Sequence, residues 1–145
     1  MEIILVEDDE YKANQIKEFL NSFGHNVQIQ YAFKSGMRAI TNTEYDMVLL
    51  DMTIPSFEIS AKHPSSRSRK YGGRDILNEM FRKEIRIPAI VITQYKVFDD
   101  GEKSLEDLDK ELAEAYPEIY KGIIYYNASI LDWQEKLQNM MNEIL

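Results

Sequence analysis

Five short apolar runs recur along the chain, and each has the length of a β-strand. They are Ile3–Val6, Val27–Ile29, Met47–Leu50, Ala89–Ile92 and Ile123–Tyr126. Most of these runs are too uniformly apolar for a sheet with one wet face, and they are typical of strands buried on both faces of a parallel sheet. The pattern therefore predicts a parallel sheet that is covered on both sides.

Helical patterns separate these runs. One stripe, formed by Ile16, Leu20 and Phe23, ends at Gly24, which is a natural C-terminal helix cap. Further helices are predicted to begin near Met37, to run from about Arg74 to Lys83, to follow the N-cap Ser104 as far as Pro117, and to carry Trp133, Leu137, Met140, Met141 and Ile144 on one face. Because each parallel crossover requires a helix, the alternation predicts a doubly wound α/β domain, flavodoxin-like, with strand order 2-1-3-4-5.

Carboxylates directly follow the first and third of these strands. The first runs into Glu7-Asp8-Asp9 and the third runs into Asp51. In the predicted order these strands are neighbours, and a crevice opens at their carboxyl ends. Like charges that close repel one another, and a hard divalent cation relieves the repulsion. We therefore predict a weak Mg²⁺ site at Glu7, Asp8 and Asp51, where a carboxylate can also act as a nucleophile; Asp9 is better placed to cap the helix.

Length and composition restrict the class of protein. The chain has 145 residues, and 25 acidic against 17 basic side chains give a formal charge of −8, which disfavours nonspecific binding to nucleic acid or to anionic lipid. It has no cysteine, so disulfides and Cys-containing zinc sites are excluded. No apolar run approaches the ~20 residues of a membrane span, and no secretory signal is visible. We expect one domain, located in the cytoplasm.

Two stretches of the sequence are atypical of a compact doubly wound α/β domain. Residues 57–72 form a long loop rich in serine and basic residues, which we expect to be mobile and to be cut first by proteases near Arg67 to Lys70. Residues 96–118 form an extended acidic segment, most simply interpreted as a solvated helix face.

Three segments resemble the receiver domain of bacterial two-component response regulators. They are Ile4–Glu10, similar to the first strand and acidic pair of that family, Tyr45–Pro55, similar to the segment around its phosphorylated aspartate, and Ile87–Thr93, similar to its fourth strand. They occur in the right order on a matching α/β pattern. The resemblance covers nearly the whole chain, so residues 1–145 are expected to form a single receiver-like domain.

The resemblance implies a role for each matched residue. Asp51 would accept phosphate, Glu7 and Asp8 would hold Mg²⁺ together with it, and Thr93 would hydrogen-bond the phosphoryl group. The protein would be a stand-alone signalling protein in a phosphorelay rather than an enzyme. Its partners would be a histidine kinase or phosphotransfer protein and a downstream protein, the latter bound through the fourth helix, fifth strand and fifth helix.

The sequence departs from the family pattern at the lysine that follows the fifth strand. The best match puts Tyr126 at the switch aromatic and Ser129 at the lysine position, and a shifted match puts Ala128 or Asn127 there instead. No register restores a lysine. We therefore expect an atypical receiver that has lost the cationic end of its pocket, and in which phosphorylation is weakly coupled to the output surface.

Other features bear on the same pocket. Gln94 stands where the family favours a small residue, and its long amide could shield Asp51 or bond to it. The loop at 57–72 and the start of the next helix carry basic residues that could replace the missing lysine or could simply be solvated. These residues are Lys62, Arg67, Arg69, Lys70 and Arg74.

Two alternatives to a phosphorylated switch remain open. One is a receiver-like interaction module that never receives phosphate and works through a constitutive surface, which Ser129 and Gln94 favour. A remote one is a haloacid-dehalogenase-like phosphatase, because Asp51 follows a strand. That family needs a second carboxylate two residues later, where this chain has Thr53.

Overall fold

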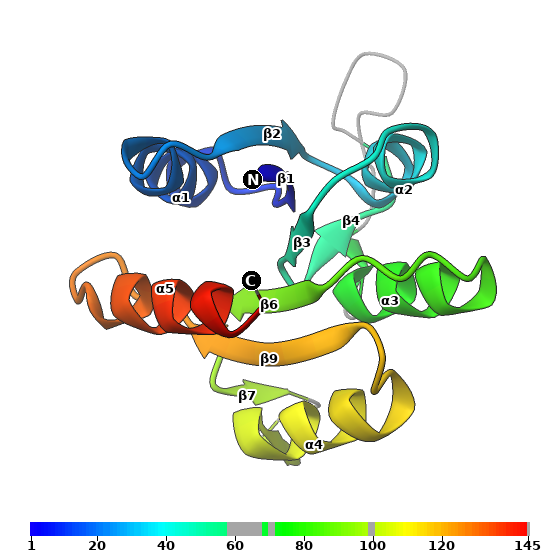
Figure 1. The fold of residues 1–145 in the computed structure, drawn as a ribbon. Coiled ribbons are helices and arrows are strands. Elements are labelled where there is room, and N and C mark those ends of the chain that lie inside the picture. The colour runs from blue at the N-terminus through cyan, green and yellow to red at the C-terminus, as the bar shows by residue number, and fades with distance from the viewer. Residues whose placement is uncertain (58–67, 70–71, 99–100, 145) are drawn as a thin grey trace.

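The computed structural model describes residues 1–57, 68–69, 72–98 and 101–144, and its centre is a parallel sheet of five strands (Figure 1). These strands are β1 (Glu2–Val6), β2 (Asn26–Gln30), β3 (Met47–Leu50), β6 (Ala89–Thr93) and β9 (Tyr120–Tyr125), and they lie in the order β2-β1-β3-β6-β9. Counted along the chain, this order is the 2-1-3-4-5 order of the flavodoxin-like fold. The predicted fold class is therefore confirmed.

Helices cover both faces of the sheet. On one face lie α1 (Glu10–Ser22) and α5 (Asp132–Ile144), and on the other lie α2 (Phe33–Asn42), α3 (Gly72–Arg82) and α4 (Leu105–Ala115). Alternate residues of β1 serve the two cores, because Ile3 and Leu5 pack with α1 and α5 whereas Ile4 and Val6 pack with α2 and α3. This arrangement explains why the central strands β1, β3 and β6 are apolar at nearly every position.

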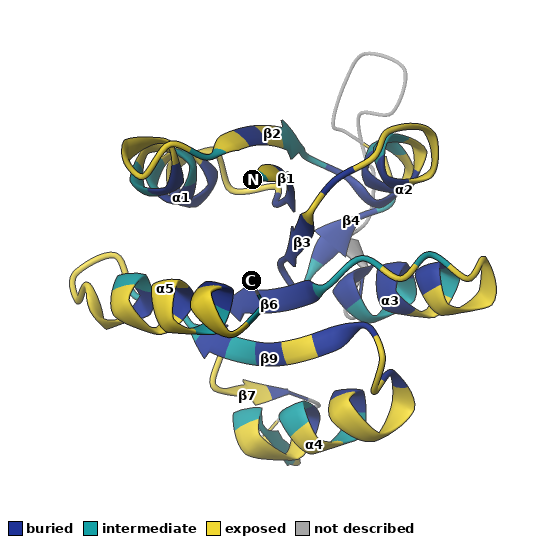
Figure 2. Ribbon diagram, viewed as in Figure 1, coloured by how far each residue is buried: buried dark blue, intermediate teal, exposed yellow. Residues whose placement is uncertain are grey.

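Burial follows the same layers (Figure 2). The central strands are buried along most of their length, whereas the outward faces of the helices are exposed. The acidic α4 buries Leu108 and Leu112 and exposes Glu106, Asp107 and Glu114, which agrees with the predicted solvated face. None of the helices in the described part of the chain is long and apolar enough to cross a membrane.

Two short hairpins were not predicted. One pairs β4 (Ile54–Pro55) with β5 (Ser68–Arg69), and the other pairs β7 (Val97–Phe98) with β8 (Lys103–Ser104). A strand of two residues is too short to show a periodic pattern, which is why the sequence did not reveal them. Residues 58–67 and 70–71 lie outside the described residues. The mobility expected for this loop is therefore untested, and the side chains of Lys62, Arg67 and Lys70 are not described.

The predicted ends of two helices are confirmed. The Asp9 side chain caps α1 by accepting a hydrogen bond from the Lys12 backbone at 3.2 Å. After α1, the Gly24 N–H donates to the Asn21 carbonyl, and Gly24 has a φ of 85°, which a glycine adopts without strain. At α4, Ser104 and the residue three positions later form a capping box.

The start of α3 packs directly on the end of β3. A Cβ atom at Gly73 would lie 2.3 Å from the Asp51 carbonyl oxygen, so only glycine permits this approach. The Gly73 N–H also donates to the Met52 carbonyl at 3.0 Å. The backbone around Asp51 is therefore fixed by the helix behind it.

Candidate functional site

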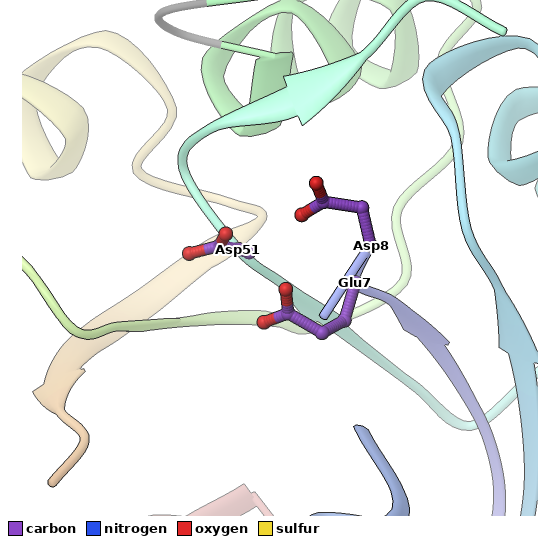
Figure 3. A group of neighbouring side chains, drawn as sticks. All are labelled: Glu7, Asp8 and Asp51. Carbon is purple, nitrogen blue, oxygen red and sulfur yellow. The ribbon is translucent and has the colours of Figure 1, made fainter. Parts of the chain in front are cut away.

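The three predicted carboxylates meet at the carboxyl end of the sheet (Figure 3). Glu7 and Asp8 follow β1, and Asp51 follows the neighbouring β3; one ligand oxygen of each lies within 4.8 Å of the others. The Asp51 N–H donates to the Val6 carbonyl at 3.0 Å, which holds the two strand ends together. Glu7 and Asp51 are buried, whereas Asp8 is exposed. The structure thus brings the predicted metal ligands together.

A lysine that the sequence analysis missed completes this cluster. The ammonium nitrogen of Lys12, in the first turn of α1, lies 2.5 Å from Glu7 Oε1 and 3.2 Å from Asp51 Oδ1. It also donates to the Ile92 carbonyl at 2.9 Å, and the Lys12 residue is 1% exposed. The expectation that the cationic end of the pocket is lost is therefore wrong. The loop between β9 and α5 contains no lysine, but an ammonium reaches the site from α1.

A sequence signal for Lys12 does exist. Lys12, Ile16 and Leu20 are spaced four residues apart, so they lie on one face of α1, and all three are buried. A lysine on the apolar stripe of a helix is costly unless an anion neutralises it, and the carboxylates predicted beside the start of this helix are such anions.

Burial dominates the electrostatics of the cluster. Removal from water, opposed by the charge of Lys12, raises the pKa of Glu7 to about 8. Burial also raises the pKa of Asp51, although Lys12 opposes the shift. For Lys12, burial acts to lower the pKa, but the charges of Asp51 and Glu7 outweigh it and the net shift is upward. The ammonium therefore stays charged and serves as counterion to both buried carboxylates.

The donor set fits Mg²⁺. All three side chains, Glu7, Asp8 and Asp51, offer oxygen atoms, which are the ligands that this hard cation prefers, and three carboxylates leave room for retained waters. The exposure of Asp8 gives solvent and a cation access to the cluster. Lys12 occupies part of the same space, because its ammonium already bonds Glu7 and Asp51.

Two further predicted positions lie at the end of β6, the strand next to β3. Thr93 is fully buried, and its hydroxyl oxygen accepts a hydrogen bond from the Tyr95 N–H at 3.2 Å. Gln94 is exposed. It lines an open hollow of about 460 Å³ whose wall also includes Lys12, Asn127 and Ala128.

The residues after β9 lie on the α1 side of the sheet. Tyr126 is buried, its hydroxyl donates to Gln15 of α1, and the Lys12 ammonium lies 5.6 Å from its ring centre. Ser129 is exposed and its N–H donates to Asn127 Oδ1 at 2.9 Å.

Of the basic residues proposed as substitutes for the missing lysine, Arg74 has its side chain in the described part of the chain. It forms an ion pair with Glu111 of α4, with 3.2 Å between Nη1 and Oε2. Among the side chains that the structure describes, the cation in the pocket is thus the ammonium of Lys12 from α1.

Comparison with known proteins finds similar sequences and folds. No family model matches the chain. The sequence is 27% identical over 152 residues to the Detocs response regulatory protein DtcB of Enterobacter cloacae, a match that covers 99% of this chain and 100% of that protein.

Solved structures share the fold. The receiver domain of the Francisella response regulator 1452 superposes with a TM-score of 0.68 at 15% identity, covering 99% of this chain and 94% of that one. The response regulator TrrA of Thermotoga maritima, solved in complex with Mg²⁺–BeF, superposes with a TM-score of 0.66 at 17% identity, covering 99% and 98%. The chain is thus similar along its whole length to a response regulatory protein and shares the fold of response regulator receiver domains, and the loop between its last strand and its last helix contains no lysine.

Proposed function

We propose that this receiver domain accepts a phosphoryl group on Asp51 and works as a phosphorelay switch. The observation that carries the proposal is the convergence of Glu7, Asp8 and Asp51 within 4.8 Å at the carboxyl ends of adjacent strands. The phosphoryl donor would be a phosphohistidine of a kinase or phosphotransfer protein. The complex of TrrA with Mg²⁺–BeF supports the proposal, because that protein has the same fold.

The transfer is a nucleophilic substitution at phosphorus. A carboxylate oxygen of Asp51 attacks the phosphorus and forms an O–P bond, while the P–N bond to the histidine breaks and leaves its electron pair on the imidazole nitrogen. A bound Mg²⁺ would supply positive charge to the phosphoryl oxygens. Glu7 and Asp8 would hold the metal, and the Thr93 hydroxyl, whose oxygen accepts from the Tyr95 N–H, would donate its proton to a phosphoryl oxygen.

The output would be a protein contact. We assign it to the surface formed by α4, β9 and α5, which lies beside the site because β9 pairs with β6. Tyr126, buried at the end of β9, would link the two regions as the switch aromatic.

A small phosphodonor tests the proposal without a known kinase. Incubation with acetyl phosphate and Mg²⁺ is expected to add the mass of one phosphoryl group to the intact protein, because the pocket itself provides the catalytic groups. Asp51→Asn should abolish the added mass. Asp46→Asn, which removes an exposed carboxylate outside the site, should leave it unchanged.

The same measurement tests the metal ligands. Asp8→Asn should raise the Mg²⁺ concentration needed for half-maximal labelling by about tenfold, because one charged ligand of three is lost. Glu10→Gln removes an exposed charge close by and should change it little. If the unmodified protein takes up no phosphoryl group while it binds a protein partner, it is instead the phosphorylation-independent module.

A further inference from the structure

The first turn of α1 places a buried cation against the proposed phosphoacceptor. Lys12 is a residue of a helix, whereas the lysine that the family resemblance implies belongs to the loop after the last strand. We propose that Lys12 supplies, from α1, the ammonium that neutralises the phosphoryl group on Asp51. The inference rests on the proposed function, since it assigns the cation of that same site.

The contacts of Lys12 are those of a cation held in place. Its ammonium has three protons, and three acceptors lie within reach: Glu7 Oε1 at 2.5 Å, the Ile92 carbonyl at 2.9 Å and Asp51 Oδ1 at 3.2 Å. Because the residue is 1% exposed, water screens these interactions little. The contact with Asp51 places the charge next to the carboxylate to which a phosphoryl group would be bonded.

The charge balance of the pocket favours such a cation. When they are ionised, Glu7, Asp8 and Asp51 carry three negative charges, against one positive charge on Lys12. Phosphorylation replaces the single charge of Asp51 by a dianionic group, so the negative charge in a largely buried site increases. A divalent metal and the Lys12 ammonium together bring three positive charges, which offset most of it.

The loop after β9 cannot provide this charge. Its residues that line the same hollow as Lys12 are Tyr126, Asn127 and Ala128, none of which is a cation, and Ser129 is exposed. Lys12 and this loop thus border one space, and the positive charge comes from the helix. The site therefore contains a cation although the loop after β9 lacks the lysine that the family resemblance implies.

Beryllofluoride, a mimic of the acyl phosphate, tests the role of Lys12. We would follow its binding with Mg²⁺ by fluorine NMR in the unmodified protein, in Lys12→Met and in Lys17→Met. Methionine keeps most of the side-chain length and removes the charge, and Lys17 is a partly exposed lysine of the same helix. We expect Lys12→Met to bind beryllofluoride at least tenfold more weakly, because it loses roughly one charged hydrogen bond. Lys17→Met should bind beryllofluoride as tightly as the unmodified protein.

The outcomes separate the two proposals. If the unmodified protein binds no beryllofluoride, the proposed function fails. If it binds beryllofluoride and Lys12→Met binds equally well or more tightly, the role of Lys12 is refuted while the proposed function stands; tighter binding would mean that Lys12 blocks the site.

A second measurement uses only the unmodified protein, in case Lys12→Met does not fold. The buried ammonium of Lys12 should give a resolved nitrogen–hydrogen NMR signal, because burial slows proton exchange with water. Beryllofluoride with Mg²⁺ should shift this signal relative to Mg²⁺ alone. A signal that stays unchanged while beryllofluoride is bound would overturn the inference.

Discussion

Replacement of Lys12 by methionine is expected to lower the free energy of unfolding by about 3–5 kcal/mol, the usual cost of leaving a buried charge without its partner. The residue is 1% exposed, and its ammonium contacts Glu7 and Asp51, both buried. Without it, the buried carboxyl groups of Glu7 and Asp51 lack their counterion. Urea unfolding at pH 7, followed by circular dichroism, measures the change.

A second substitution tests the cause of this loss. Glu7→Gln replaces a carboxyl group whose ionised form is unfavourable to bury, so Lys12→Met with Glu7→Gln should be more stable than Lys12→Met alone. Lys17→Met on the same helix is the matched control and should change stability by less than about 1 kcal/mol. Equal stability of the single and double variants would contradict the electrostatic explanation.

Removal of the Trp133 side chain is expected to cost about 3–5 kcal/mol, the range for deleting a large buried aromatic group. Trp133 of α5 is 1% exposed. Its ring lies 5.3 Å from that of Phe19 in α1 and 5.4 Å from that of Tyr126. It therefore joins the two helices on this face of the sheet and supports the aromatic side chain beside Lys12.

The thermal midpoint of unfolding measures this effect, read by circular dichroism because the variant Trp133→Ala loses the chain's single tryptophan. Phe81→Ala is a suitable comparison, because that ring is 58% exposed and packs mainly on Tyr116. We expect it to cost much less than Trp133→Ala. A small shift for Trp133→Ala would show that α5 is held mainly by other contacts.

Much of the fold was predictable from the sequence, and the reason lies in burial. Strands β1, β3 and β6 are buried at nearly every position, so their apolar runs were unambiguous. The edge strand β9 was less clear: it begins at Tyr120, earlier than predicted, because Lys121 faces water and interrupts the apolar run. An edge strand has fewer neighbours to exclude water, so its sequence alternates.

The carboxylate half of the site was predictable and the cationic half was not. Glu7, Asp8 and Asp51 follow strands, and the strand order alone brings them together. The strand order does not predict that Lys12 lies in the site. A lysine in a helix is usually solvated, and its burial depends on the tertiary contact between α1 and the end of β3. Two assignments that the family resemblance implies remain proposals: Ser129 at the lysine position and Tyr126 as the switch aromatic.

A crystal structure of the protein with Mg²⁺ and beryllofluoride tests the central claim most directly. We predict beryllofluoride on Asp51, the metal among Glu7, Asp8 and Asp51, and the Lys12 ammonium within hydrogen-bond distance of a fluorine atom. Crystals grown under these conditions in which Asp51 carries no beryllofluoride, and in which Lys12 still bonds Glu7 and the Ile92 carbonyl as described here, would contradict the account.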